Sequence, residues 1–384
     1  MSNKIVTDPL CNVGPKRWFR GNTHCHTSQC DGDTDPWGVA VWYRDHGYDF
    51  LVLSEHNQML VLKESPGLLL IPGMEITGRK HLHTTALGIE KPIPWEFDHS
   101  DKGAILQDHI DAIALADALP ILNHPNFMEG VTLSTLLSLN GMGLLEVFNG
   151  HPHCHSFGNE RYPSVETLWD GVLSAHKQVY GIASDDAHHF QVWGEKQANP
   201  GRGWIMVQAE QLTKEHILEA ICCGRFYAST GVRLLLLERH QGVLRLHVDA
   251  MPDGLSVYDA LLFRTSGDST PEVWIDFISF GGKIVHRQVG LVGEISLDGV
   301  QGYLRARVTM VLKGALGAQT RTLYAWTQPI FMQKPDYRYE YRPGHIRSWM
   351  LTIQSVWLHQ IRGIRKALRY YHTRYFLPLL LRFQ

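Results

Sequence analysis

The chain has 384 residues, of which 44% are hydrophobic and 19% are charged, as is typical of a globular protein of two or three domains. It holds no run of about 18 apolar residues, so the sequence predicts no membrane-spanning segment. The six cysteines lack the spacing of a disulfide framework, and the first ten residues lack the apolar core of a signal peptide. We therefore expect a cytoplasmic protein.

The formal net charge of −2 conceals a basic C-terminal tail. From Tyr341 to Gln384 there are eight Lys/Arg and no Asp/Glu, and apolar residues recur at helical spacing from His345 onward. Residues 332–384 are predicted to form a linker and a basic amphipathic helix. This helix would bind peripherally to an anionic membrane, associate with the acidic body of another copy, or pack on its own chain. Because the remainder is acidic, we expect a small-molecule substrate and no stable nucleic-acid partner.

Strand and helix signals alternate from residue 16 to residue 231. Strands are predicted up to His26 and over 48–54, 68–76, 83–89, 119–124, 144–148, 179–184 and 204–208, and helices over 36–46, 104–118, 164–176 (capped by Ser164) and 213–223. This alternation predicts an α/β fold with a parallel sheet, open or closed into a barrel. From 232 to 331, short alternating runs and a Gly281-Gly282 turn predict a small antiparallel β-sandwich.

Histidines and acidic residues gather where the predicted strands end. His24 and His26 are two residues apart, so their side chains point to the same face of a strand. Similar positions along the chain are taken by Asp31, Glu55, His56, Glu75, His81, His83, His124, Glu146, Asp185, Asp186, His188 and His189. Imidazoles and carboxylates suit zinc, manganese or iron, and this set exceeds what one ion needs, so we infer two or three ions. The histidines in or beside helices are expected at the surface: His46, His99, His109, His176 and His216.

These motifs resemble the polymerase and histidinol phosphatase (PHP) superfamily. The resemblance lies in His-x-His-Thr-x-x-x-Asp-Gly at 24–32, Ser-Glu-His at 54–56, Glu75, Asn-His-Pro at 123–125 and Ser-Asp-Asp-Ala-His at 184–188. Segments 149–152, 201–204, 224–231 and 325–330 are similar to its carbaryl-hydrolase-like (CehA/McbA-like) group. The resemblance implies a distorted (β/α)7 barrel with a di- or trinuclear centre. It implies as ligands His24, His26, Asp31, His56, Glu75, His83, His124, Asp186 and His188.

The same resemblance implies a metal-dependent hydrolase, and we expect a phosphoesterase that uses a metal-bound hydroxide. Asp186, His189 and Arg225 are expected to act in catalysis, and Arg202, Arg225 and His153 to hold an anionic group of the substrate. The alternative is a carbamate or carboxylic ester hydrolase, whose aromatic pocket Trp37, Phe127, Phe148 and Trp193 could line. A non-catalytic metal-binding scaffold is a third hypothesis, which the complete ligand set argues against.

Overall fold

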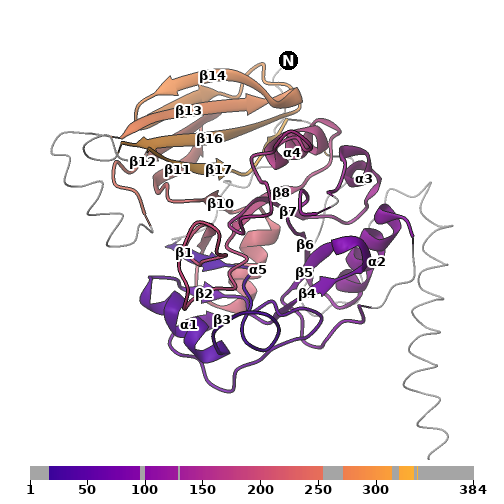
Figure 1. Cartoon of the computed structure of the whole chain (residues 1–384). Coiled ribbons are helices and arrows are strands. Elements are labelled where there is room, and N and C mark those ends of the chain that lie inside the picture. The colour runs from indigo at the N-terminus through magenta and orange to yellow at the C-terminus, as the bar shows by residue number, and fades with distance from the viewer. Residues whose placement is uncertain are drawn as a thin grey trace, which may run out of the picture. The chain divides into compact units, whose positions relative to one another are not determined.

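The computed structural model describes residues 17–95, 100–128, 130–253, 271–313, 320–332 and 335. They all belong to one compact unit within Met1–Gly344 and form a mixed α/β structure (Figure 1). The predicted C-terminal helix lies outside the described residues. Among the described helices, none is long and apolar enough to cross a membrane.

The described residues contain the following elements. The helices are α1 (Pro36–Asp45), α2 (Lys102–Leu115), α3 (Leu133–Ser138), α4 (Val165–Ser174) and α5 (Lys214–Cys222). The strands of the first part are β1 (Arg17–Asn22), β2 (Phe50–Leu51), β3 (Leu69–Leu70), β4 (Gly73–Thr77), β5 (His83–Leu87), β6 (Leu119–Leu122), β7 (Leu144–Asn149), β8 (Tyr180–Ser184), β9 (Trp204–Ala209) and β10 (Phe226–Ser229). The later strands are β11 (Leu234–His240), β12 (Val243–Val248), β13 (Glu272–Ser279), β14 (Lys283–Val289), β15 (Val292–Ser296), β16 (Tyr303–Leu312), β17 (Arg321–Thr327) and β18 (Ile330–Phe331).

Each of these helices begins next to a polar side chain that accepts a backbone N–H of the first turn. These N-caps are Asp35, Asp101, Thr132, Ser164 and Thr213. Ser164 caps α4 as the sequence predicts. The sequence does not reveal α3, because six residues are too few to show a helical period.

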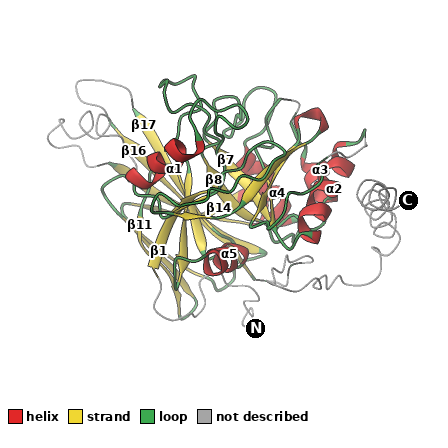
Figure 2. Ribbon diagram, turned by 90° about the horizontal axis from the view of Figure 1, so that it is seen from below, coloured by secondary structure: helices red, strands yellow, loops and turns green. Residues whose placement is uncertain are grey.

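Two sheets carry the first part of the chain. One has the order β4-β5-β6-β7-β8, and β10, β9, β1, β2 and β3 lie in a larger sheet that continues through β17 and β16. Isolated parallel bridges connect the two sheets where β1 and β2 have ended: Cys25 pairs with Ala187, and His56 pairs with Glu75. Figure 2 shows the strands at the centre, with α1, α5 and the group α2, α3 and α4 on different sides.

The strands are not all parallel, and this corrects the prediction. β5 runs antiparallel to β4 and β6, and β9 runs antiparallel to β1. A short 3-10 turn, Arg79–His81, lies between β4 and β5, and a connection this short cannot cross over to a parallel neighbour. The single strand predicted over 68–76 is also wrong, because β3 and β4 are separate strands with Pro72 between them.

The second part packs two antiparallel sheets around a common apolar core. Strands β11, β12 and β15 form one sheet, and Leu246 of β12 is buried in one cluster with Phe277 of β13 and Val308 of β16. Gly281 and Gly282 have positive φ (74° and 70°) in the predicted turn between β13 and β14. The larger sheet continues into this part, because β10 pairs with β17. The domain boundary after Gly231 falls between β10 and β11 and stays a prediction.

A buried ion pair connects α4 to β16. Arg305 is 0% exposed and donates hydrogen bonds to both carboxylate oxygens of Asp170, at 2.8 and 2.6 Å. It also pairs with Glu166 at 2.8 Å, and the Tyr303 hydroxyl donates to Asp170 at 2.7 Å. Losing one member of such a pair leaves charges buried without compensation.

We therefore predict that Arg305→Ala lowers the free energy of unfolding by about 3–5 kcal/mol. The control is Lys313→Ala, which breaks the exposed pair between Lys313 and Glu272 and should cost about 1 kcal/mol or less. Urea-induced unfolding of both variants measures the difference. Equal losses in the two variants would contradict the structural role of the Arg305 pair.

Candidate metal centre

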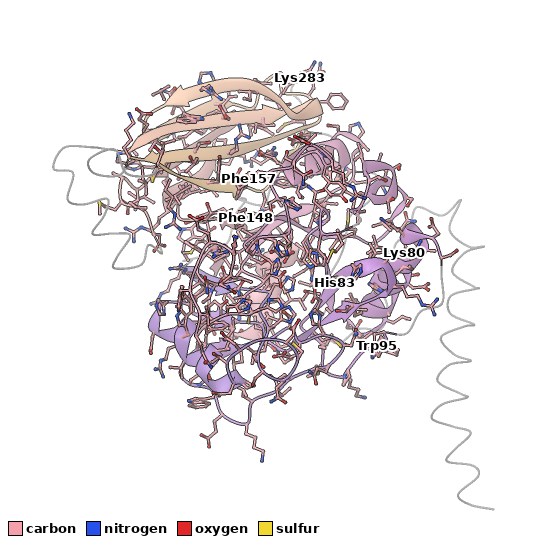
Figure 3. The ribbon with its side chains drawn as sticks, in the orientation of Figure 1. Lys80, His83, Trp95, Phe148, Phe157 and Lys283 are labelled. Carbon is pink, nitrogen blue, oxygen red and sulfur yellow. The ribbon has the colours of Figure 1, made fainter. Side chains whose placement is uncertain are left out.

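The carboxylate of Glu75 lies at the centre of a cluster of histidines. Glu75 is in β4 and is 0% exposed. Five imidazoles place a nitrogen 2.9–3.5 Å from one of its oxygens: His24, His26, His56, His83 and His124. His83 lies inside the body with these groups, whereas Lys80 of the preceding turn is exposed (Figure 3). The chain segments after β1, β2 and β6 and the start of β5 thus converge on one side chain of β4.

Three ligand atoms in this cluster, from His24, His26 and Asp186, have the spacing of a tetrahedral site, and the carboxylate of Glu75 lies beside the two histidines. The Nε2 atoms of His24 and His26 are 3.2 Å apart, and each lies 3.2 Å from Asp186 Oδ1. The same two nitrogens lie 3.2 and 3.5 Å from the oxygens of Glu75. Metal–ligand bonds of about 2.1 Å in tetrahedral geometry place the ligand atoms about 3.4 Å apart. His24, His26 and Asp186 therefore fit three ligand positions of a divalent transition-metal ion, and Glu75 lies near enough to both histidines to contribute a further oxygen.

The surroundings of one buried carboxylate oxygen also suit a bound cation. Glu75 Oε2 accepts no hydrogen bond from the described residues, and the Nδ1 of the adjacent His56 is hydrogen-bonded with Thr77 Oγ1 at 2.6 Å. A charged oxygen buried without a donor is costly, and a bound cation would satisfy it.

Other sets of ligand atoms adjoin this one. Asp31 lies 3.3 Å from His188 Nε2 and 3.5 Å from His56 Nε2, and its side chain is 54% exposed. With His26 these residues form a second set, and His56, Glu75 and His83 form a third. The second and third sets share His56. A neutral imidazole has a single lone pair, so His56 can bind an ion at only one of these two positions at a time. A fourth set joins His24, His124 and Asp186, and together the sets include all nine ligands that the resemblance implies.

The electrostatics of the cluster prepare it for a cation. Burial alone would raise the pKa of Glu75, but the imidazoles of His83 and His24 hold it well below its usual value. The pKa of Asp186 is lowered in the same way, against burial, by His24 and its neighbours. Burial lowers the pKa of His26 to about 4. The two carboxylates are therefore ionised and His26 is neutral at pH 7, whereas the neighbouring carboxylates raise the pKa of His24, His124 and His188, so a metal ion would release protons from these rings when it binds.

Glu146 orients His24 from behind. Its Oε1 lies 2.8 Å from His24 Nδ1, and its Oε2 accepts the backbone N–H of His124 at 2.8 Å. Asn149 donates side-chain hydrogen bonds to both Glu146 and Asp186, at 3.0 and 3.2 Å. A metal-binding histidine usually donates a hydrogen bond from its second ring nitrogen to such a carboxylate. The sequence showed Glu146 at a strand end but gave it no role.

The structure corrects the prediction for Arg225. This residue directly precedes β10, whose first residue Phe226 pairs with Val207, which in turn pairs with Phe19 of β1. Phe19 lies near the start of β1, whereas His24 follows its end. Arg225 therefore lies at the opposite end of the strands, where it pairs with Glu219 at 3.0 Å.

The other predicted substrate residues lie nearer to the cluster. The Arg202 guanidinium donates to the carbonyl oxygens of Gly150 and Gly194, at 3.1 and 2.8 Å, so it holds two loops together. His189 Nδ1 accepts the backbone N–H of Ala198 at 3.2 Å. His153 is exposed, and its ring lies 5.3 Å from that of His151.

Sequence reasoning missed His151 as a site residue. Its ring lies 5.6 Å from that of His188 and 6.1 Å from that of Phe127. The Phe127 ring also lies 5.1 Å from that of His124. The signal was present, because His151 follows β7 within the Asn-Gly-His-Pro run. His109 was predicted at the surface, but it is 0% exposed.

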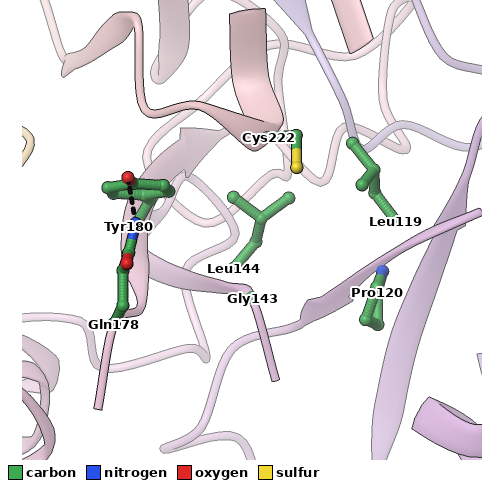
Figure 4. A pocket seen from close by; sticks show the side chains of 7 residues that line it. All are labelled: Leu119, Pro120, Gly143, Leu144, Gln178, Tyr180 and Cys222. Carbon is green, nitrogen blue, oxygen red and sulfur yellow. Dashed lines mark hydrogen bonds between the residues drawn. The ribbon is translucent and has the colours of Figure 1, made fainter. Parts of the chain in front are cut away.

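The opposite end of these strands offers no comparable site among the described residues. A cavity of about 10 Å³ lies there beside the starts of β6, β7 and β8, lined by Leu119, Leu144, Tyr180 and Cys222 (Figure 4). This volume holds about one water molecule.

Comparisons with known proteins give limited information. No family model and no curated protein matches the chain. One similar solved structure is a two-domain protein from Bacteroides vulgatus that contains a predicted PHP-like metal-dependent phosphoesterase, with 15% identity, a TM-score of 0.42, and coverage of 84% of this chain and 99% of that one. Another, from Bifidobacterium adolescentis, is described as a candidate metal-dependent phosphoesterase, with 16% identity, a TM-score of 0.35, and coverage of 53% and 96%. Both TM-scores are too low to establish a shared fold, so the case for the metal centre rests on its own residues.

We predict that Glu75→Gln removes most of the bound metal, because the neutral amide cannot balance cations at the centre of the cluster. Asp31→Asn should remove about one ion or less per chain, because Asp31 belongs to the outer set. Elemental analysis after dialysis measures the metal content, and His176→Ala is the control that should match wild type. A Glu75→Gln variant that keeps its full metal content would contradict the central position of Glu75.

Proposed function

We propose that the protein is a metal-dependent hydrolase, and that its centre binds two or three ions. The observation that carries this proposal is the near-tetrahedral spacing of His24, His26 and Asp186, with Glu75 beside both histidines and further candidate ligand sets next to them. Bound divalent ions would lower the pKa of a water to about 7 and polarise an oxygen of the substrate.

The residues of the chain hold and orient this centre. The two oxygens of Glu75 face different histidines, Oε1 facing His24 and Oε2 facing His26, and Glu146 holds the other ring nitrogen of His24. Asp186 Oδ1 faces His24 and His26, while its Oδ2 accepts a hydrogen bond from Asn149. Asp186 is therefore engaged on both oxygens, which favours a holding role over free proton transfer.

We also propose that the strands around the centre form the distorted (β/α)7 barrel of the PHP superfamily. Seven strands would close the ring: β1, β2, β4, β5, β6, β7 and β8. The support is the pairing of β4 to β8 in order, the pairing of β1 with β2, and the two bridges Cys25–Ala187 and His56–Glu75.

A phosphoester is the substrate class that we propose. Several ion positions lie side by side around Glu75, and anionic oxygens of a phosphoester could bridge neighbouring ions. His151 and His189 lie beside His188, and His153 lies beside His151, so these residues could donate hydrogen bonds to such a substrate.

A carboxylic ester or carbamate is the second candidate, and two observations favour it. Arg225 lies away from the cluster and Arg202 is engaged by carbonyl oxygens, so neither is a free anion-binding group. Phe127 is partly exposed, and its ring lies 5.1 Å from that of His124 and 5.9 Å from that of His83, where it could contact an aryl group.

We predict that metal-loaded protein hydrolyses p-nitrophenyl phosphate with a higher kcat/KM than p-nitrophenyl acetate or a naphthyl carbamate. Inorganic phosphate should inhibit competitively, because it would bind to the same ions as the phosphoester substrate. Asp186→Ala should lower kcat/KM by at least about 100-fold, since a ligand is lost, whereas His176→Ala should be unchanged.

Two results would decide against this prediction. Esterase activity that exceeds phosphatase activity by orders of magnitude, without phosphate inhibition, would support the second candidate. Activity that survives chelation and the Asp186→Ala substitution would contradict metal-dependent hydrolysis altogether.

A further inference from the structure

The thiol of Cys30 lies among the proposed metal ligands but belongs to none of the ligand sets used above. Cys30 Sγ lies 3.4 Å from His26 Nδ1 and donates a hydrogen bond to Glu55 Oε2 at 2.6 Å. Asp31 Oδ1 is farther from the same His26 nitrogen, at 3.9 Å. Cys30 is thus better placed than Asp31 to hydrogen-bond the outer nitrogen of His26.

Glu55 is the partner that holds the thiol. It is 0% exposed, and its Oε2 also accepts the backbone N–H of Thr27 at 3.3 Å. Its Oε1 is buried without a hydrogen-bond partner among the described residues. Burying a carboxylate with so few donors costs stability, so packing alone does not account for Glu55 at this position.

We infer that Cys30 is a positioning residue of the proposed metal centre, where it links His26 to Glu55 and holds the His26 ring for metal binding. His26 Nδ1–H would donate to Cys30 Sγ, and the Cys30 thiol would donate to Glu55 Oε2. The lone pair of His26 Nε2 then points toward Glu75 and Asp186, which lie 3.5 and 3.2 Å from it. This inference rests on the proposed metal centre and adds two residues that the nine-ligand assignment lacks.

The rings of His24 and His26 are therefore held by hydrogen-bond partners of different strength. His24 Nδ1 lies 2.8 Å from a carboxylate, Glu146, whereas His26 Nδ1 faces a sulfur, which is a weak acceptor. Loss of an outer partner of a ligating histidine typically lowers metal affinity by about 10–100-fold. We therefore expect that a substitution of Cys30, or a modification of its thiol, lowers the metal affinity of the position that His26 occupies.

The test compares Cys30→Ala with Cys30→Ser by competition of each full-length protein with a chelator for Zn²⁺. Cys30→Ala should bind the most weakly held ion about 10–100-fold less tightly. Cys30→Ser should bind it nearly as tightly as wild type, because a hydroxyl both accepts and donates. Cys222→Ala is the matched control, because Cys222 lies in the cavity at the other end of the strands, and it should bind like wild type.

Alkylation gives a second measurement on protein that has already folded. Wild type that mass spectrometry shows to be carbamidomethylated at Cys30 should bind zinc less tightly, because the modification removes the S–H donor, whereas iodoacetamide should leave the zinc affinity of Cys30→Ser unchanged. Equal zinc affinities of wild type, Cys30→Ala and alkylated wild type would contradict the role of Cys30 but would leave the proposed metal centre standing. A wild-type protein that binds no zinc would overturn the metal centre and this inference together.

Discussion

A single buried carboxylate, that of Glu75, is the constraint around which the site is built. It is fully buried and has five imidazole nitrogens within 3.5 Å. Such a charge is stable in the interior only if positive charge or several donors surround it. Asn123 donates to Oε1 at 2.7 Å, whereas the nitrogen nearest to Oε2, His56 Nδ1 at 2.9 Å, is hydrogen-bonded with Thr77 Oγ1 at 2.6 Å. Bound cations would complete this balance, and they would explain why segments distant in sequence place histidines here.

The antiparallel direction of β5 helps to bring a histidine to Glu75. His83 is the first residue of β5, and because β5 runs antiparallel to β4, it lies beside Glu75 as do the residues that follow β1, β2 and β6. The loop after β7 carries His151 and leads into α4, which the Arg305–Asp170 pair joins to β16. Phe148 and Phe157 flank this loop and contact Trp326 and Tyr324 of β17 (Figure 3). The second part of the chain thus stabilises the loop beside the metal centre.

Local patterns identified residues that the structure brings together as candidate ligands, but they did not show which proposed substrate residues lie near them. The His24–His26 spacing and the strand-end positions of Glu75 and Asp186 depend on strand geometry, which a single sequence reveals. Arg225 was misplaced because the direction of β10 depends on its pairing with β9, which no local pattern encodes. His109 was misassigned because the exposed face of α2 depends on packing against β5.

The hydrogen bonds between the candidate ligands and their partners could not be predicted from the sequence either, because they also depend on strand pairing. Glu146 and His24 are 122 residues apart, and Cys30 and Glu55 are 25 residues apart. Their contacts exist only once the strands are paired. The overall α/β pattern and four of the five described helices were predicted, whereas strand direction required long-range pairing.

The most direct test of the account is a crystal structure of the purified protein with anomalous diffraction measured at the manganese, iron and zinc absorption edges. The account predicts an anomalous peak between His24, His26, Glu75 and Asp186, with at least one further peak beside His56. Crystals grown from protein purified without chelator, in the presence of added zinc, that show no peak at either position would contradict it.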